Sequence, residues 1–119
     1  MVNAYPEQWS SVAISESEST YFYDPASVIK EGSTVKYWEL ANYKKPLTAG
    51  NLTVASSKSL MLADCQSDRY RTLRVIDYDM SDARGRIVNI NLTENSPWLK
   101  TNEGSVDDAM LRMVCKSAN

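Results

Sequence analysis

Apolar and polar residues follow a period of two in several stretches of the chain, and this spacing is typical of half-buried β-strands. The strongest such stretch runs from Thr34 to Tyr43 and is rich in β-branched and aromatic residues. Both faces of this strand carry apolar residues, whereas a strand with one solvent-exposed face would alternate apolar and polar residues more regularly. We therefore expect it to be covered on both sides. Further strands are predicted over residues 9–15, 20–23, 58–66, 69–79 and 86–92.

Short polar segments separate these strands. Pro25 ends the second strand, because proline lacks the backbone N–H that a sheet ladder needs, and Gly85 lies where a turn can require a positive φ. Residues 47–57 are predicted to form a connecting loop, and residues 93–104 are too polar for a strand. Sequential strands joined by short turns predict an antiparallel meander.

One helix is predicted at the C-terminal end, from Ser105 to Lys116. Ser105 is a capping residue and acidic residues follow it in the first turn, where the helix dipole favours them. One apolar stripe has the i, i+3, i+4, i+7, i+8 spacing of a buried helix face: Val106, Ala109, Met110, Met113 and Val114. At about 100° per residue, Cys115 lies nearly opposite this stripe. Either the helix is buried on two sides or its last turn is distorted.

The composition indicates one globular domain. The chain has 119 residues, 43% of them apolar and 24% charged, and its net charge is −2. This size buries one core, and the charge balance leaves no basic footprint for nucleic acid. Residues 1–8 have no period and are predicted to be an unstructured lead before a single domain over residues 9–119. No signal-peptide pattern and no long apolar run is visible in this chain.

The two cysteines, Cys65 and Cys115, suggest a disulfide between the middle of the sheet and the last element. Such a bridge closes a loop of 50 residues and contributes about 4 kcal/mol on the loop-entropy model. An oxidising compartment would be its natural setting. The alternative is two buried free thiols in a cytosolic protein.

Residues with catalytic or metal-binding potential are few. The chain contains no histidine, which removes the commonest general base at neutral pH, and its glycines form no phosphate-binding loop. Asp77, Asp79 and Asp82 lack a calcium-loop pattern, so we interpret them as solvated charges. Glu39 is expected to face an edge or solvent, and Asp64 to pair with an arginine. We therefore predict a protein that is not an enzyme and uses no metal or other cofactor.

Arginines recur at the start of the strand predicted over residues 69–79. Arg69, Arg71 and Arg74 could together form a patch for an anionic ligand. Asp68 and Asp77 are interleaved with them, which favours ordinary cross-strand ion pairs. The sequence therefore predicts ion pairs here rather than a binding patch.

Aromatic residues are concentrated on the predicted strands, and most are expected to lie in the core. Those on the sheet face away from the helix are candidates for a partner or dimer surface, because tyrosine and tryptophan are frequent interface anchors. The candidate residues for this surface are Tyr37, Tyr43, Lys44, Lys45 and Tyr70.

Several short motifs follow one another along the chain in a characteristic order. They are Tyr23-Asp24-Pro25, Val28-Ile29-Lys30, Gly32, the run from Val35 to Tyr43, Ser56-Ser57-Lys58, Asp64-Cys65, Arg69, Gly85, Trp98, Gly104-Ser105 and Cys115. In order and spacing this pattern resembles the bacterial surface-adhesin protein E family. The sequence departs from the lipoproteins of that family in having no lipobox cysteine at its start.

The resemblance implies an α+β fold, in which an antiparallel meander of about six strands carries the C-terminal helix on one face, tied by the Cys65–Cys115 disulfide. The helix should cover the face that bears Met61, Ala63 and Cys65 and leave the other face free for a partner.

The resemblance also implies a function. It suggests a non-enzymatic binding module, exported to the bacterial outer-membrane surface or periplasm. The expected partners are host extracellular-matrix or serum proteins such as vitronectin and laminin, and the module can form a homodimer. The alternative is a periplasmic inhibitor or immunity-type protein that blocks an enzyme.

Overall fold

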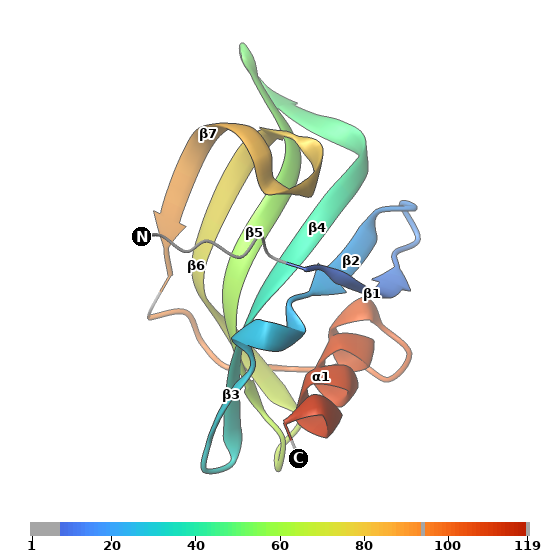
Figure 1. Cartoon of the computed structure of the whole chain (residues 1–119), viewed down its shortest axis with the longest axis vertical. Coiled ribbons are helices and arrows are strands. Elements are labelled where there is room, and N and C mark those ends of the chain that lie inside the picture. The colour runs from blue at the N-terminus through green and yellow to red at the C-terminus, as the bar shows by residue number, and fades with distance from the viewer. Residues whose placement is uncertain (1–7, 94, 119) are drawn as a thin grey trace.

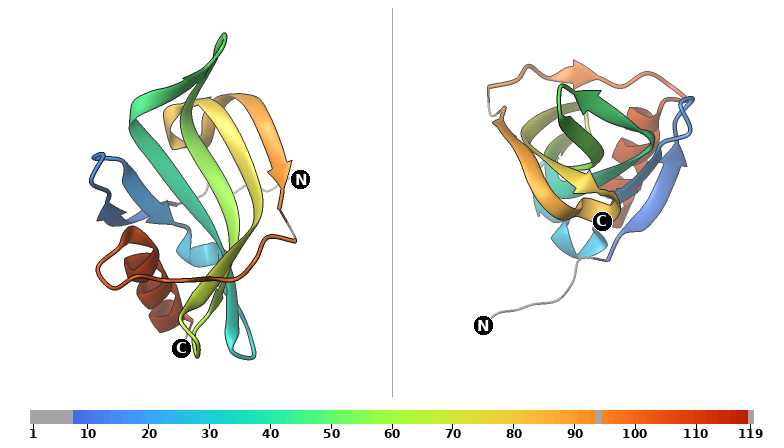
Figure 2. Two further views of the ribbon diagram at one scale, coloured as in Figure 1. Left: turned by 180° about the vertical axis from the view of Figure 1, so that it is seen from behind. Right: turned by 90° about the horizontal axis from the view of Figure 1, so that it is seen from above.

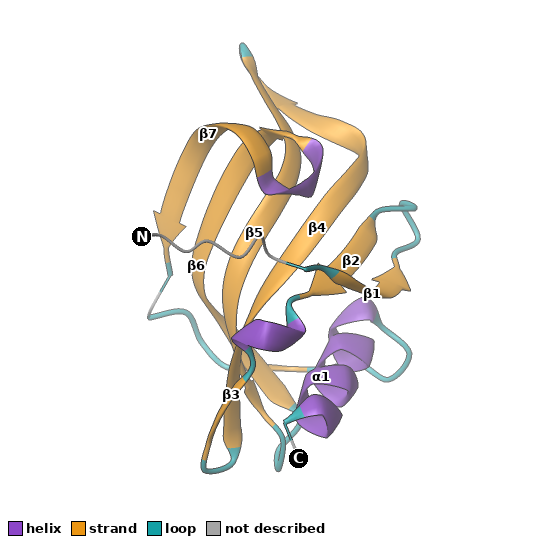
Figure 3. Cartoon of the chain, in the orientation of Figure 1, coloured by secondary structure: helices purple, strands orange, loops and turns teal. Residues whose placement is uncertain are grey.

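A computed structural model describes residues 8–93 and 95–118 and shows one strongly curved antiparallel sheet with a helix against it (Figures 1 and 3). The principal strands follow the order β1-β2-β4-β5-β6-β7, with bounds Ser10–Ile14, Thr20–Tyr23, Thr34–Ala49, Leu52–Asp64, Arg69–Met80 and Arg84–Leu92. Two short strands pair alongside, β3 (Ile29–Glu31) with β4 and β8 (Leu99–Lys100) with β6. The helical elements are η1 (Pro25–Ser27), η2 (Ser81–Ala83) and α1 (Val106–Ser117). The predicted fold class is confirmed.

The hairpin between β4 and β5 is longer than predicted. Residues 47–57 were expected to form a loop, but the two strands pair almost to the tip, where Ala49 lies opposite Leu52. Gly50, at φ +60°, makes the tight turn that permits this pairing. The prediction of a loop was wrong because backbone hydrogen bonds to a neighbouring strand outweigh the weak strand propensity of this segment.

The register of the strands divides the sheet into two faces, because paired residues share a face and successive residues alternate. We call the face that carries α1 the helix face; it bears Val35, Tyr37, Met61 and Ala63. The opposite face is called the open face. Seen from behind, the segment that leads into α1 crosses in front of the lower strands and places the helix on this side (Figure 2, left).

The core lies between the helix face and α1. Met110, Leu111 and Val114 are buried against the sheet, and Cys115 forms the predicted disulfide with Cys65, with their Cα atoms 5.9 Å apart. The buried face of α1 is rotated about the helix axis relative to the predicted apolar stripe, because Met113, a member of that stripe, is 39% exposed. The buried arc is a single face that runs from Met110 round to Cys115, so neither a second buried side nor a distorted turn is needed.

The open face is also covered in part, as expected for the central strand. Leu40 is fully buried there, and the turn containing η2 curls over β4 and β5 (Figure 1). Ser56 holds this turn by donating to the carbonyl of Met80 and accepting from the N–H of Ala83. Asn42 and Asp82 fix its tip through two hydrogen bonds of 2.7 and 2.8 Å.

The predicted N-terminal lead, residues 1–8, lies outside the described residues except for Gln8. Within the part of the chain that is described, no helix has the length and apolar character needed to cross a membrane.

Candidate interaction surface

The structure places the three candidate tyrosines on the helix face rather than on the face away from it. Tyr37 is only 2% exposed and packs beneath α1, so its predicted surface position is corrected. Tyr70 donates a 2.8 Å hydrogen bond to Asp107 of the helix. Tyr43 donates one of 2.8 Å to Ser57. A bulge in β6, where it pairs with β5, exchanges the faces to which odd- and even-numbered residues point. It turns Tyr70 toward the helix.

The two candidate lysines, Lys44 and Lys45, are exposed where the pairing of β4 with β5 is irregular. Lys45 lines a hollow of about 480 Å³ with Tyr21 and Tyr43. The candidate residues are therefore distributed between the core, the helix contact and this hollow, and do not form one continuous surface.

Glu39 lies among these tyrosines on the helix face, so the prediction that it faces an edge or solvent is wrong. Burial, with a smaller contribution from the negative charge of Asp107, raises the pKa of Glu39 to about 8. Burial likewise raises the pKa of Tyr21 and Tyr43. Within the described part of the chain, no hydrogen-bond or ion-pair partner contacts the Glu39 carboxyl group. The sheet therefore holds one carboxyl group in an environment that favours its neutral form.

A row of exposed apolar residues of the open face lies on β7. Ile87, Ile90 and Leu92 are 50%, 55% and 65% exposed. Ile90 pairs with Ile76 and Leu92 with Arg74 of β6, so these side chains share the open face. We call Ile87, Ile90 and Leu92 the β7 patch. Such a row is unlike the scattered single apolar residues of an ordinary surface.

Basic residues are concentrated on the open face beside and below the β7 patch. Six cations lie there by strand register or by aromatic contact: Lys36, Lys58, Arg69, Arg71, Arg74 and Lys100. The Lys58 ammonium lies 4.8 Å from the ring centre of Trp38, and the Arg71 guanidinium 5.5 Å from that of Trp98. These distances are those of cation–π contacts.

The acids interleaved with these arginines do not pair with them. Asp77 points to the helix face, where it accepts a 2.6 Å hydrogen bond from Ser57. Asp68 accepts two hydrogen bonds of 3.2 Å from Arg112 of α1. The predicted cross-strand ion pairs are therefore wrong, because alternation and the turn direct both carboxylates away from the open face.

Other predicted acids have local structural partners. Asp79 accepts from the N–H of Arg86, and Asp64 accepts from the N–H groups of Gln66 and Ser67. A hydrogen bond from the Ser67 side chain, followed by these backbone bonds and nearby Arg69, lowers the pKa of Asp64. The described residues contain no group of three acids, cysteines or histidines placed to hold a metal ion.

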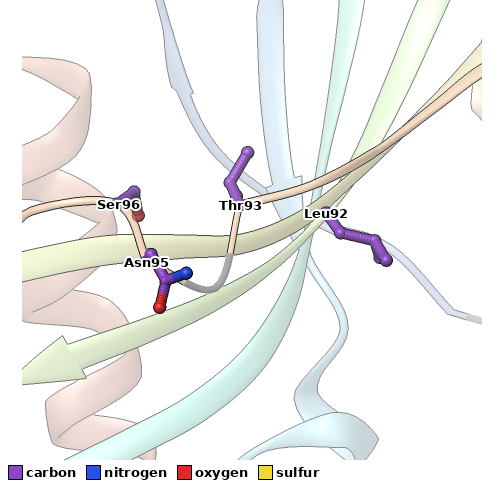
Figure 4. Close-up of a pocket in the computed structure, with 4 residues that line it drawn as sticks. All are labelled: Leu92, Thr93, Asn95 and Ser96. Carbon is purple, nitrogen blue, oxygen red and sulfur yellow. The ribbon is translucent and has the colours of Figure 1, made fainter.

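A hollow of about 440 Å³ lies beyond the end of β7, lined by Leu92, Thr93, Asn95 and Ser96. Thr93 and Ser96 both donate 2.7 Å hydrogen bonds to the carbonyl of Thr72. The four side chains point in different directions (Figure 4). Because polar groups do not converge, the hollow lacks the features of a small-molecule site.

Comparison with known proteins identifies the fold and the family. The family model described as surface-adhesin protein E matches residues 9–116. The chain belongs to the surface-adhesin protein E family. The family membership supports an adhesin-like, exported and surface-associated protein.

A solved structure supports the same architecture. The chain is similar to the crystal structure of protein E from non-typeable Haemophilus influenzae, with a TM-score of 0.63 and 12% sequence identity. The match covers 98% of this chain and 82% of that one, and at this identity it shows the fold alone. A comparison with curated protein sequences found no match to the chain.

Proposed function

We propose that this domain is a non-enzymatic adhesin, exported to the bacterial outer-membrane surface or periplasm, that binds a host extracellular-matrix or serum protein through the β7 patch. The observation that supports this proposal is the exposed apolar row on the last strand of the sheet. Family membership points to the same class of function.

The position of β7 makes the patch accessible to a partner protein. β7 ends the strand order, so within the described residues its outer backbone edge has no neighbouring strand. An exposed edge can accept an extended segment of a partner, while apolar side chains beside it provide the buried centre of an interface. The arginine opposite Leu92, Arg74, supplies a polar rim.

Replacing Ile90 and Leu92 with aspartate should weaken binding to immobilised vitronectin or laminin by about tenfold or more, because charge would be buried at the centre of the interface. Surface plasmon resonance measures the dissociation constant. The matched control is Ile14→Asp, since Ile14 is 69% exposed on β1 at the opposite end of the sheet. It should bind like the unmodified protein. Absence of saturable binding by the unmodified protein would contradict the proposal.

A second copy of the chain is the other partner that we propose. Pairing of two β7 edges would continue the sheet and shield Ile90 and Leu92 of both copies. Sedimentation at tens of micromolar protein should therefore give a dimeric mass, and the Ile90→Asp, Leu92→Asp variant a monomeric one. A monomeric mass for the unmodified protein would rule out this dimer without affecting the test of host-protein binding.

A further inference from the structure

The open face beside and below the β7 patch combines a high local positive charge with a sheet surface that α1 does not cover. We propose that it binds a sulfated glycosaminoglycan, a linear polysaccharide with sulfate groups, through Lys36, Arg69, Arg74 and Lys100. This site goes beyond the proposed protein-binding function. It includes none of the three residues of the β7 patch, and Arg74, opposite Leu92, lies at the border between the two.

The cations are arranged in register across adjacent strands. Lys36 of β4 shares a row with Arg71 of β6, with Leu62 between them. Arg69 pairs with Lys100 of β8 in the next row. Strands lie about 4.8 Å apart, and same-face residues about 6.6 Å apart along a strand. The positive charges therefore form a continuous strip that an extended polyanion can follow.

The charge of this strip contrasts with that of the whole chain. Six cations lie on it in a protein whose net charge is −2. Glu31 at the β3 edge and Asp64 at the turn lie in the end row of the strip, and Asp82 lies higher on the same face, where it accepts a hydrogen bond from Asn42. The Asp64 carboxylate is directed to backbone N–H groups of its own turn. Lys36, Arg74 and Lys100 have no ion pair with a described carboxylate, so their charges are available to an anion.

The structure favours a sulfated polysaccharide over an acidic peptide. The strip is carried mainly by β4, β5 and β6, whose backbones already pair with neighbours on both sides over this region. A peptide therefore cannot add there as a new strand. Side chains alone must make the contacts, and lysine and arginine form strong charge-assisted hydrogen bonds with oxyanions.

Single-stranded nucleic acid is a poorer fit to the same strip. Its binding sites present free aromatic rings on which bases stack. The two tryptophans of this face, Trp38 and Trp98, already stack with Lys58 and Arg71. The rings therefore serve to position cations rather than to receive bases.

Heparin-agarose chromatography tests the proposal directly. The unmodified protein should be retained at about 50 mM NaCl despite its net negative charge, and should elute as salt rises because salt screens the contacts. The triple variant Lys36→Glu, Arg74→Glu, Lys100→Glu should bind heparin about tenfold more weakly or worse. A neutral triple variant, Lys36→Gln, Arg74→Gln, Lys100→Gln, should also bind heparin more weakly. It controls for misfolding caused by charge reversal.

The matched control changes the same total charge away from the strip: Lys44→Glu, Lys45→Glu, Lys116→Glu. These lysines are exposed on β4 beyond the strip and on α1, so this variant should keep more than half of the heparin affinity. Failure of the unmodified protein to be retained, or equal loss in both triple variants, would overturn the proposal.

Competition experiments identify the chemistry of the ligand. Heparin should displace the bound protein, whereas desulfated heparin, poly-glutamate and oligo-deoxythymidine should not. Equal displacement by poly-glutamate or oligo-deoxythymidine would overturn the assignment to a sulfated polysaccharide. An Ile90→Ala, Leu92→Ala variant adds no negative charge opposite Arg74 and should therefore retain heparin binding. This variant separates failure of this site from failure of the β7 patch.

Discussion

Replacing Cys65 and Cys115 with alanine should lower the free energy of unfolding by about 4 kcal/mol, because the bridge closes a loop of 50 residues and restricts the unfolded chain. The bridge also anchors the last turn of α1, a helix of 12 residues that is too short to be stable alone. Urea denaturation followed by circular dichroism measures the change. A single transition of lower midpoint is expected.

Reduction provides the control for this experiment. A reducing agent should shift the midpoint of the unmodified protein toward that of the double variant and leave the double variant unchanged. A loss of less than about 1 kcal/mol would contradict the loop-entropy explanation. The helix would then be held mainly by Met110, Leu111 and Val114, which are buried against the sheet.

The unmodified protein should lose stability as the pH rises from 5 to 8, and Glu39→Gln should abolish most of this loss. The pKa of Glu39 is about 8 in the folded protein and 4.5 as its ordinary value. The folded state therefore binds the proton more tightly, and its stabilisation is complete below pH 4.5 and is lost as the pH rises toward 8. For the unmodified protein this linkage lowers the free energy of unfolding by roughly 3 kcal/mol between pH 5 and pH 8.

The groups around Glu39 explain why its ionised form is disfavoured. Tyr21, Tyr37, Tyr43 and Tyr70 lie on the same face, and Asp107 approaches from α1. None of these supplies a positive charge. Urea denaturation at pH 5, 6, 7 and 8 should therefore show a decline for the unmodified protein and a much flatter profile for Glu39→Gln.

An exposed acid supplies the control for the pH series. Glu31 lies on β3 and is exposed, so Glu31→Gln should keep the decline of the unmodified protein. A flat profile for the unmodified protein would show that Glu39 ionises normally. An unchanged decline in Glu39→Gln would place the responsible group elsewhere.

Much of the fold follows from local sequence patterns. The predicted helix from Ser105 to Lys116 agrees with α1, and Ser105 caps it by accepting from the N–H of Asp108. Helix capping depends on residues a few positions apart, which is why sequence reveals it. The hairpin over residues 47–57 was missed, because it depends on pairing between strands rather than on local preference.

The candidate surface was less predictable than the fold. Tyr37 and Tyr70 were expected on the face away from the helix, yet both face α1. The bulge in β6 reverses the parity that simple alternation would assign. The Arg69, Arg71 and Arg74 series was discounted because of its interleaved acids, and only the register shows that those acids lie elsewhere.

The sequence by itself determined the strand-rich fold, the capped helix and, with the family resemblance, the bridge between Cys65 and Cys115, because periodicity, capping and cysteine number are readable along the chain. Only the tertiary structure decided which side chains share a face. Strand register, bulges and helix rotation place Glu39 among tyrosines and gather the cations on the open face. These relations join residues distant in sequence, so no local pattern encodes them.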